Sequence, residues 1–133
     1  MRIILLDLNY TLVSNSEIKI NPFENQIKKE QYRTDLIYAL RNDYVVLITA
    51  RPERYKKQTL DSLKRKAGFT PHSTYFNGVN LPPPQCKEYY LKNNLLNAYN
   101  KDAMLAIESN PRTRAMYKRY NIKVVTYKEF MEL

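Results

Sequence analysis

One stretch near the start of the chain decides how the rest is interpreted: Ile3-Ile4-Leu5-Leu6-Asp7-Leu8-Asn9-Tyr10-Thr11. Consecutive apolar residues with no polar alternation are typical of a strand that is buried on both faces of a sheet. A carboxylate stands directly after this run, and polar side chains follow it at Asn9 and Thr11. The stretch therefore predicts a buried strand over residues 2–6 that ends in a candidate functional loop.

The same pattern recurs along the chain, where short apolar runs are separated by segments with helical spacing. Further strands are predicted at residues 44–48, 73–76, 103–107 and 122–125. Helices are predicted at residues 24–40, 52–67, 85–99, 111–120 and 128–131. Strands that alternate with helices form a parallel sheet through right-handed crossovers. We therefore expect an α/β fold: a three-layer α/β/α sandwich around a Rossmann-like, doubly wound, mainly parallel five-stranded sheet.

Length and composition fit one soluble domain over residues 1–133. Hydrophobic residues make up 44% and charged residues 26%, which excludes collagen-like and disordered chains. The single cysteine, Cys86, cannot form an internal disulfide. No segment is long and apolar enough to span a membrane, and the first apolar run is too short for a secretory signal. We expect a cytoplasmic protein with no membrane partner.

The predicted strands end in chemically active side chains. Asp7 follows the first strand, Thr49 the second and Glu108 the fourth, while Lys87 opens the helix before the fourth strand. The carboxyl ends of parallel strands meet at one edge of the sheet, where ligands bind. A carboxylate can attack phosphorus, a hydroxyl and backbone amides can hold phosphoryl oxygens, and an ammonium can neutralise their charge. This set of groups favours phosphoryl chemistry.

Four segments in this order resemble the motifs of the haloacid dehalogenase (HAD) superfamily of phosphohydrolases. Residues 7–11 are similar to its DxDxT motif, residues 47–52 to its second motif, Lys87 to its third-motif lysine and residues 107–111 to its acidic fourth motif. The resemblance covers nearly the whole chain and implies the HAD-like fold and a magnesium-dependent phosphatase that works through an aspartyl phosphate.

The resemblance also implies roles for the matching positions. Asp7 would be the nucleophile and a ligand of Mg²⁺, residue 9 the acid/base and a further ligand, Lys87 the catalytic cation and Glu108 a third ligand of the metal. Phosphate would be bound by a set of four residues, namely Leu8, Thr49, Ala50 and Arg51.

Two positions depart from the family pattern. Asn9 stands where the family has a second aspartate, and Ser109 replaces the second acid of the fourth motif. An amide cannot exchange a proton with a leaving group as a carboxyl does, and such help is worth about 10²- to 10⁴-fold in rate. We therefore expect a slow enzyme.

Chain length and charge indicate a large anionic substrate. The stretches on either side of Thr49 are too short for a cap domain, and about residues 8–22 suffice only for a short hairpin flap. The formal charge is +9, and residues 51–66 hold seven Lys or Arg against two acids. Residues 49–53 and 110–117 also resemble the phosphatase domains of polynucleotide kinase-phosphatases. These features favour a phosphorylated nucleic acid or nucleotide as partner.

Other interpretations stay open from the sequence. Ser109 and Asn110 could cap the helix that begins at Pro111, and Lys92 competes with Lys87 for the role of active-site cation. The basic runs could be solvated helix faces. The protein could also be a catalytically degenerate relative that binds phosphate, nucleic acid or a protein partner. A receiver-like phosphoacceptor ranks last, because Asp7 ends the first strand and no acidic pair precedes it.

Overall fold

The computed structural model describes all residues, 1–133, and contains one sheet of five parallel strands. The strands are β1 (Ile3–Leu6), β2 (Tyr44–Pro52), β3 (Ser73–Asn77), β4 (Met104–Ile107) and β5 (Lys123–Val125). Their order across the sheet is β3-β2-β1-β4-β5. Register pairs Leu6 with Leu47 of β2 and with Ile107 of β4, so β1 is the central strand. The predicted parallel α/β fold is confirmed.

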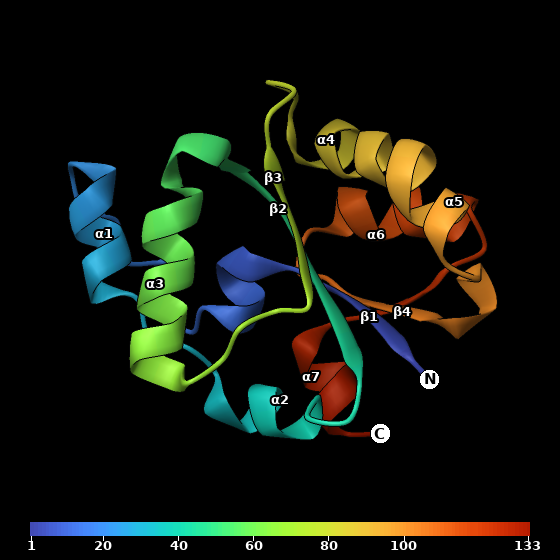
Figure 1. Cartoon of the computed structure of the whole chain (residues 1–133), viewed down its shortest axis with the longest axis horizontal. Coiled ribbons are helices and arrows are strands. Elements are labelled where there is room, and N and C mark those ends of the chain that lie inside the picture. The colour runs from blue at the N-terminus through green and yellow to red at the C-terminus, as the bar shows by residue number, and fades with distance from the viewer.

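Helices cover both faces of the sheet (Figure 1). They are α1 (Phe23–Lys29), α2 (Thr34–Ala39), α3 (Lys56–Ala67), α4 (Pro83–Tyr90), α5 (Leu96–Ala98), α6 (Pro111–Arg119) and α7 (Tyr127–Met131). Short helical turns occupy Leu8–Leu12, Glu53–Tyr55, Leu91–Leu95 and Lys101–Ala103. No helix is both long and apolar enough to cross a bilayer.

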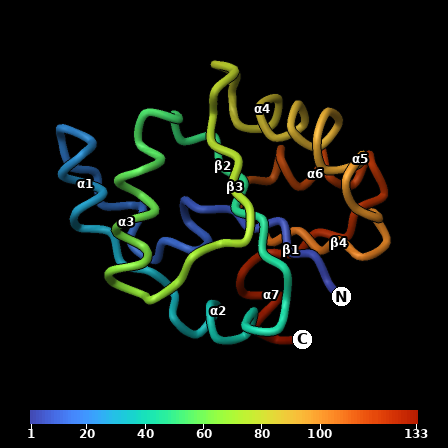
Figure 2. Tube along the Cα trace, viewed as in Figure 1, coloured from blue at the N-terminus to red at the C-terminus, as the bar shows by residue number.

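Two apolar cores, one on each face, hold the layers together. Alternating side chains of β1 divide between them: Ile4 and Leu6 pack with α2, α3 and α7, while Ile3 and Leu5 pack with α4 and α6. The chain trace in Figure 2 shows the two helical groups on opposite sides of the strands. Burial of β1 on both faces explains why its sequence is a continuous apolar run.

The predicted helix over residues 24–40 is wrong in one respect, because the structure breaks it into α1 and α2. Residues 30–33 are extended between them, and Tyr32 forms an antiparallel bridge with Val13. The Arg33 amide donates to the Leu12 carbonyl at 2.8 Å, and the Tyr32 hydroxyl to Ser62 Oγ at 2.9 Å. These partners lie far away in sequence, so helical periodicity could not reveal the break.

The segment for which a hairpin flap is expected has no pair of strands. Leu8 and Leu12 are fully buried in the core between the sheet and α3, and Val13 beside them is buried as well. Residues 14–22 form an irregular loop, tied to the extended segment by the Ser14 amide, which donates to the Gln31 carbonyl at 2.8 Å. The apolar side chains of residues 8–13 therefore anchor this part of the chain to the domain.

Helix ends follow the local sequence signals. Gly68 ends α3 with a φ of +64°, a left-handed conformation that suits glycine. The Asn110 side chain accepts from the amides of Arg112 and Thr113 and so caps α6, which begins at Pro111. The predicted cap is confirmed for Asn110 and is wrong for Ser109, whose hydroxyl donates to Asp7 instead.

Candidate active site

The candidate site lies where the order of the strands reverses. From β1 the chain moves outward to β2 and β3, then returns to β4 and β5 on the other side of β1. The loops that follow β1 and β4 therefore diverge to opposite faces and leave a crevice at the carboxyl edge of the sheet. Asp7 follows β1, and Glu108 and Ser109 follow β4.

Asp7 is a buried carboxylate with four hydrogen-bond donors around it. Its Oδ1 accepts from Lys87 Nζ at 2.8 Å. Its Oδ2 accepts from Thr11 Oγ1 at 2.8 Å, from Ser109 Oγ at 2.8 Å and from the Ser109 amide at 3.3 Å. The carboxylate is thus held in one orientation by groups from three separate segments.

Lys87 lies between two carboxylates on the inner side of α4. Its Nζ is 2.8 Å from Asp7 Oδ1 and 2.6 Å from Glu108 Oε1, and the residue is only 2% exposed. Lys92, the alternative cation on the predicted helix, is exposed to solvent. The structure therefore brings Lys87, and not Lys92, to Asp7.

Burial and the ion pairs set the protonation of this cluster. Burial opposes the charge on Asp7, but the Lys87 ammonium and hydrogen bonds together lower the pKa of the carboxyl below its usual range. Burial likewise opposes the charge on Lys87, yet Asp7 and Glu108 raise its pKa above the ordinary value. Asp7 is therefore a carboxylate and Lys87 an ammonium at neutral pH.

A cavity of about 180 Å³ opens beside Asp7. It is lined by Asp7, Asn9, Tyr10, Thr49, Ala50, Pro83, Lys87, Glu108, Ser109 and Asn110. Pockets for whole small molecules are usually about 300–1,000 Å³. The cavity is therefore too small for a whole ligand of ordinary size and can accept only a small group of a larger molecule.

Asn9 lines the cavity and is oriented from behind by Arg51. The Arg51 guanidinium is buried, pairs with Glu30 and donates to Asn9 Oδ1 at 2.8 Å. Arginine has only donors, so this contact assigns the amide oxygen of Asn9 to Arg51 and leaves the Nδ2 protons for another acceptor. Asn9 can donate a hydrogen bond to a phosphoryl or leaving-group oxygen, but it cannot transfer a proton.

The four residues predicted to bind phosphate take different places. Thr49 and Ala50 line the cavity, where the pairing of β2 with β3 shifts register between Ile48 and Pro52. The Arg51 side chain lies behind Asn9, outside the cavity lining, and Leu8 is fully buried in the core. The side chains of Arg51 and Leu8 therefore do not reach a ligand in the cavity. The Arg51 amide already donates to Thr49 Oγ1 at 3.1 Å, so only the Leu8 amide remains a candidate.

The oxygen atoms beside the cavity are of the type that binds a hard cation, but they provide little negative charge. Ser109 Oγ lies 2.8 Å from Asp7 Oδ2 and 3.3 Å from the Asn9 carbonyl oxygen. Both oxygens of Glu108 already accept hydrogen bonds, one from Lys87 and one from the Asn110 amide at 3.0 Å. Magnesium commonly binds to one or two carboxylates, waters and substrate phosphate. These residues therefore fit Mg²⁺ only when a phosphate supplies further oxygens.

Three contacts of the site were not predicted from the sequence. Thr11 and Ser109 both donate to Asp7, and Glu30 pairs with Arg51. The spacing of Thr11, four residues after Asp7, was a usable signal for the first contact. No local pattern marks Glu30, because it follows α1 and its partner Arg51 lies far along the chain on β2.

Of the comparisons with known proteins, the one with solved structures finds the same architecture. No family model matches the sequence, and no curated protein matches it. Among solved structures, a chain in the structure of a Pnkp1/Rnl/Hen1 complex is similar, with a TM-score of 0.72 and 15% sequence identity. The match covers 94% of this chain and 45% of that chain, so this chain spans less than half of its neighbour. At this identity the likeness shows a shared fold.

Proposed function

We propose that this protein removes a terminal phosphate from a nucleic acid or nucleotide, with Asp7 as the attacking group. The observation that carries the proposal is the buried, ionised Asp7 carboxylate held by Lys87 at the switch point of the sheet. A carboxylate with a lowered pKa stays ionised and can act as a nucleophile. The small cavity and the excess of basic residues support a large, anionic substrate.

The reaction divides into two displacements at phosphorus. An Asp7 oxygen attacks, the ester P–O bond breaks, and the leaving oxygen takes a proton from water. Water then attacks phosphorus, which breaks the bond to Asp7 and releases inorganic phosphate and a proton. Lys87 keeps its positive charge beside Asp7 throughout. These are the steps that the resemblance to HAD phosphohydrolases implies.

The residues around Asp7 assist with charge and hydrogen bonds. Thr49 and Ala50 line the cavity and supply candidate donors to phosphoryl oxygens, as does Nδ2 of Asn9. When bound, Mg²⁺ would neutralise phosphoryl charge, held by Asp7 and the Asn9 carbonyl, with Ser109 beside them. Glu108, also expected as a ligand, lines the same cavity. Because no carboxyl stands at residue 9, both displacements lack the acid/base that the resemblance implies at that position and should be slow.

A second candidate function is phosphate recognition without turnover. The Asn9 amide and the Ser109 hydroxyl favour it, because both groups hydrogen-bond without exchanging protons with a substrate. In that case the protein would bind a phosphorylated strand or a protein partner through the same cavity and release no phosphate.

A phosphate-release screen separates the two functions. Substrates would be nucleotides, 3′- and 5′-phosphorylated oligonucleotides and p-nitrophenyl phosphate, each with Mg²⁺ and with a chelator. We expect slow release that chelation abolishes and that Asp7→Asn reduces by at least about 10³-fold, since the nucleophile is lost. Acid-quenched enzyme should retain labelled phosphate that hydroxylamine removes.

Two other outcomes would reject the phosphatase. One is release that Asp7→Asn leaves unchanged, which would point to a contaminant. The other is tight binding of phosphorylated oligonucleotides with no release from any substrate, which would establish the second function. Circular dichroism of Asp7→Asn shows whether the variant keeps the fold.

A further inference from the structure

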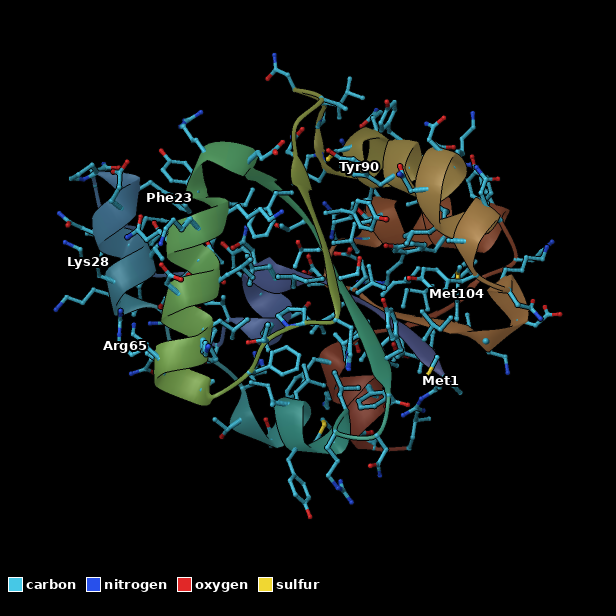
Figure 3. All side chains as sticks on the ribbon, in the orientation of Figure 1. Met1, Phe23, Lys28, Arg65, Tyr90 and Met104 are labelled. Atoms are coloured by element: carbon cyan, nitrogen blue, oxygen red, sulfur yellow. The ribbon has the colours of Figure 1, made fainter.

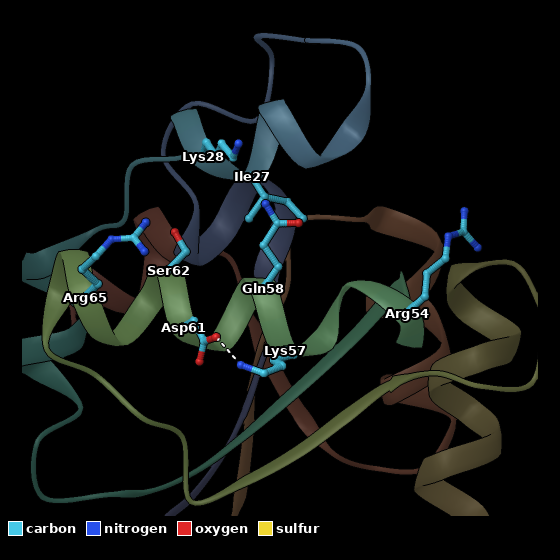
Figure 4. Close-up of a pocket in the computed structure, with 8 residues that line it drawn as sticks. All are labelled: Ile27, Lys28, Arg54, Lys57, Gln58, Asp61, Ser62 and Arg65. Carbon is cyan, nitrogen blue, oxygen red and sulfur yellow. Dashed lines mark hydrogen bonds and ion pairs between the residues drawn. The ribbon is translucent and has the colours of Figure 1, made fainter.

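A basic groove of about 420 Å³ lies between α1 and α3, apart from the cavity beside Asp7 (Figure 4). Its cations are Lys28 from α1 and Arg54, Lys57 and Arg65 from the turn before α3 and from α3 itself. The one carboxylate in the lining is Asp61. The four cations are exposed, and Figure 3 shows Lys28 and Arg65 at the same outer edge of the molecule.

Polar contacts hold this groove open between the two helices. Gln58 Nε2 donates to the Glu24 carbonyl at 2.9 Å, and Lys66 Nζ donates to the Lys28 carbonyl at 2.6 Å. Ile27 and Ser62 are buried at its floor. These contacts therefore fix α1 and α3 relative to each other, and the groove between them has cations along its walls.

The existing charge pairing in the groove is weak. Lys57 and Asp61 are 2.9 Å apart on successive turns of α3, with side chains 89% and 61% exposed. Such exposed pairs contribute at most about 1 kcal/mol, because water screens them. A phosphate can therefore replace Asp61 as the partner of Lys57 at little cost.

Side chains in contact connect the groove to the active site. Arg54, at one end of the groove, lies over the Tyr55 ring with its guanidinium carbon 4.7 Å from the centroid. Tyr55 packs on Phe23 with a centroid distance of 4.8 Å, and Phe23 is in turn 5.0 Å from the guanidinium carbon of Arg51. Arg51 reaches Asn9 in the cavity. An aromatic pair therefore lies between the groove and the cavity.

We infer that this groove binds the sugar-phosphate backbone of a single-stranded nucleic acid. Spaced cations track phosphates, and aromatic rings beside them stack on bases, which contributes about 1–3 kcal/mol per base. Lys57 and Arg65 alone are separated by about 12 Å along α3 at 1.5 Å per residue, and Arg54 lies beyond Lys57 in the preceding turn, so the cations span several nucleotides. Phe23 and Tyr55 favour a nucleic acid over an acidic peptide. Entry of the strand's terminal phosphate into the cavity depends on the proposed function. Binding of the strand in the groove does not depend on it.

Binding of a fluorescein-labelled, unphosphorylated oligothymidylate of about 12 nucleotides tests the groove without any catalysis. The groove variant is Lys28→Ala/Arg54→Ala/Arg65→Ala. The control, Lys101→Ala/Lys118→Ala/Lys123→Ala, removes the same charge from exposed lysines elsewhere. We expect at least a tenfold loss of affinity in the groove variant at low salt. The slope of log K against log salt should become shallower by about 2, since each phosphate contact contributes about 0.7. The control should bind as the parent does.

Equal losses in both triple variants, or none in the groove variant, would overturn the inference, since binding would then follow net charge alone. Equal competition by a poly-glutamate peptide would overturn the nucleic-acid assignment. A 4-thiothymidine oligonucleotide should crosslink unmodified protein within residues 23–28 or 54–65, and crosslinks elsewhere alone would contradict the groove. Phosphate release is measured separately. If the groove variant loses binding and the parent releases no phosphate from any substrate, the phosphatase is rejected and the nucleic-acid groove is supported.

Discussion

Asn9 is the residue at which the candidate site departs from the DxDxT motif that residues 7–11 resemble. Its backbone carbonyl is 3.3 Å from Ser109 Oγ, while its side-chain oxygen accepts from Arg51 at 2.8 Å. The residue can therefore bind and orient oxygen atoms. Its side chain has no proton that it can exchange near neutral pH.

Replacement of this amide by a carboxyl should accelerate the reaction. Asn9→Asp supplies a base for the attacking water, and we expect a rise of about 10- to 100-fold in kcat for a phosphorylated oligonucleotide. This is below the full range for acid/base help, because the Arg51 guanidinium would hold the new carboxyl ionised and make it a poor acid. p-Nitrophenyl phosphate, whose leaving group needs no acid, serves as the comparison. An unchanged or lower rate on both substrates would contradict this account of residue 9.

Ser109 gives a second prediction at the level of one residue. Its hydroxyl lies beside both Asp7 Oδ2 and the Asn9 carbonyl, where a carboxylate would double the free negative charge available to a cation. Ser109→Asp should therefore increase Mg²⁺ affinity by about tenfold or more, as measured by calorimetry in the presence of inorganic phosphate, which supplies the further oxygens. Ser109→Asn adds a neutral oxygen and is the matched control. Equal affinities in the two variants would show that charge at this position does not limit metal binding.

Helices α4 and α6 illustrate how elements position the site. Helix α4 carries Lys87 inward, and α6 begins directly after the loop that holds Glu108 and Ser109. Glu88, the next residue of α4, accepts from the Tyr120 hydroxyl and from Arg119 at 3.2 Å. These contacts connect the outer side of α4 to the end of α6.

This connection predicts a pH-dependent contribution to stability. The Tyr120 hydroxyl and Arg119 lower the pKa of Glu88 below its usual value, against a smaller effect of burial. A carboxyl with a lowered pKa in the folded state stabilises it above the pKa of the unfolded chain, about 4.3, and the contribution is lost as pH falls through the folded value. Glu88→Gln should therefore reduce the unfolding free energy at pH 7 by less than about 1 kcal/mol, since solvent screens the group.

Urea unfolding at several pH values checks this prediction. The difference between the parent and Glu88→Gln should be present at pH 7 and should shrink below about pH 4. A difference that stays constant down to pH 3 would mean that the glutamine has perturbed packing.

At the level of the whole molecule, one sheet separates two apolar cores. Leu63 of α3 is fully buried on one face and Met116 of α6 on the other. The faces share only the strands between them. Loss of packing on one face should therefore leave contacts on the other unchanged.

Large-to-small substitutions test this separation. Leu63→Ala and Met116→Ala should each lower the unfolding free energy by about 2–5 kcal/mol. The double variant should show their sum to within about 0.5 kcal/mol, because the two side chains have no common partners. Lys64→Ala, next to Leu63 and exposed, is the control and should change stability by less than about 0.5 kcal/mol. A coupling energy well above 1 kcal/mol would show that the sheet transmits strain between its faces.

Much of the fold could be predicted because local sequence specifies it. Apolar runs such as residues 44–48 marked all five strands, and Gly68 and Asn110 marked helix ends through their own backbone and side-chain preferences. The break between α1 and α2 could not be predicted, since Tyr32 finds its partners on Val13 and Ser62. Helical periodicity reports which residues face the core, and it continues across a break that distant contacts impose.

For the candidate site, local sequence was enough to predict which groups reach the carboxyl edge of the sheet, because strand ends in a parallel sheet must gather there. What each group touches depends on the packing of the folded chain. This packing turned Lys87 between Asp7 and Glu108, placed Ser109 against Asp7, and buried Arg51 on Glu30 behind Asn9. The reason is physical: a strand places its last residue within a few ångströms, whereas hydrogen bonds and ion pairs depend on side-chain directions that packing of remote segments selects.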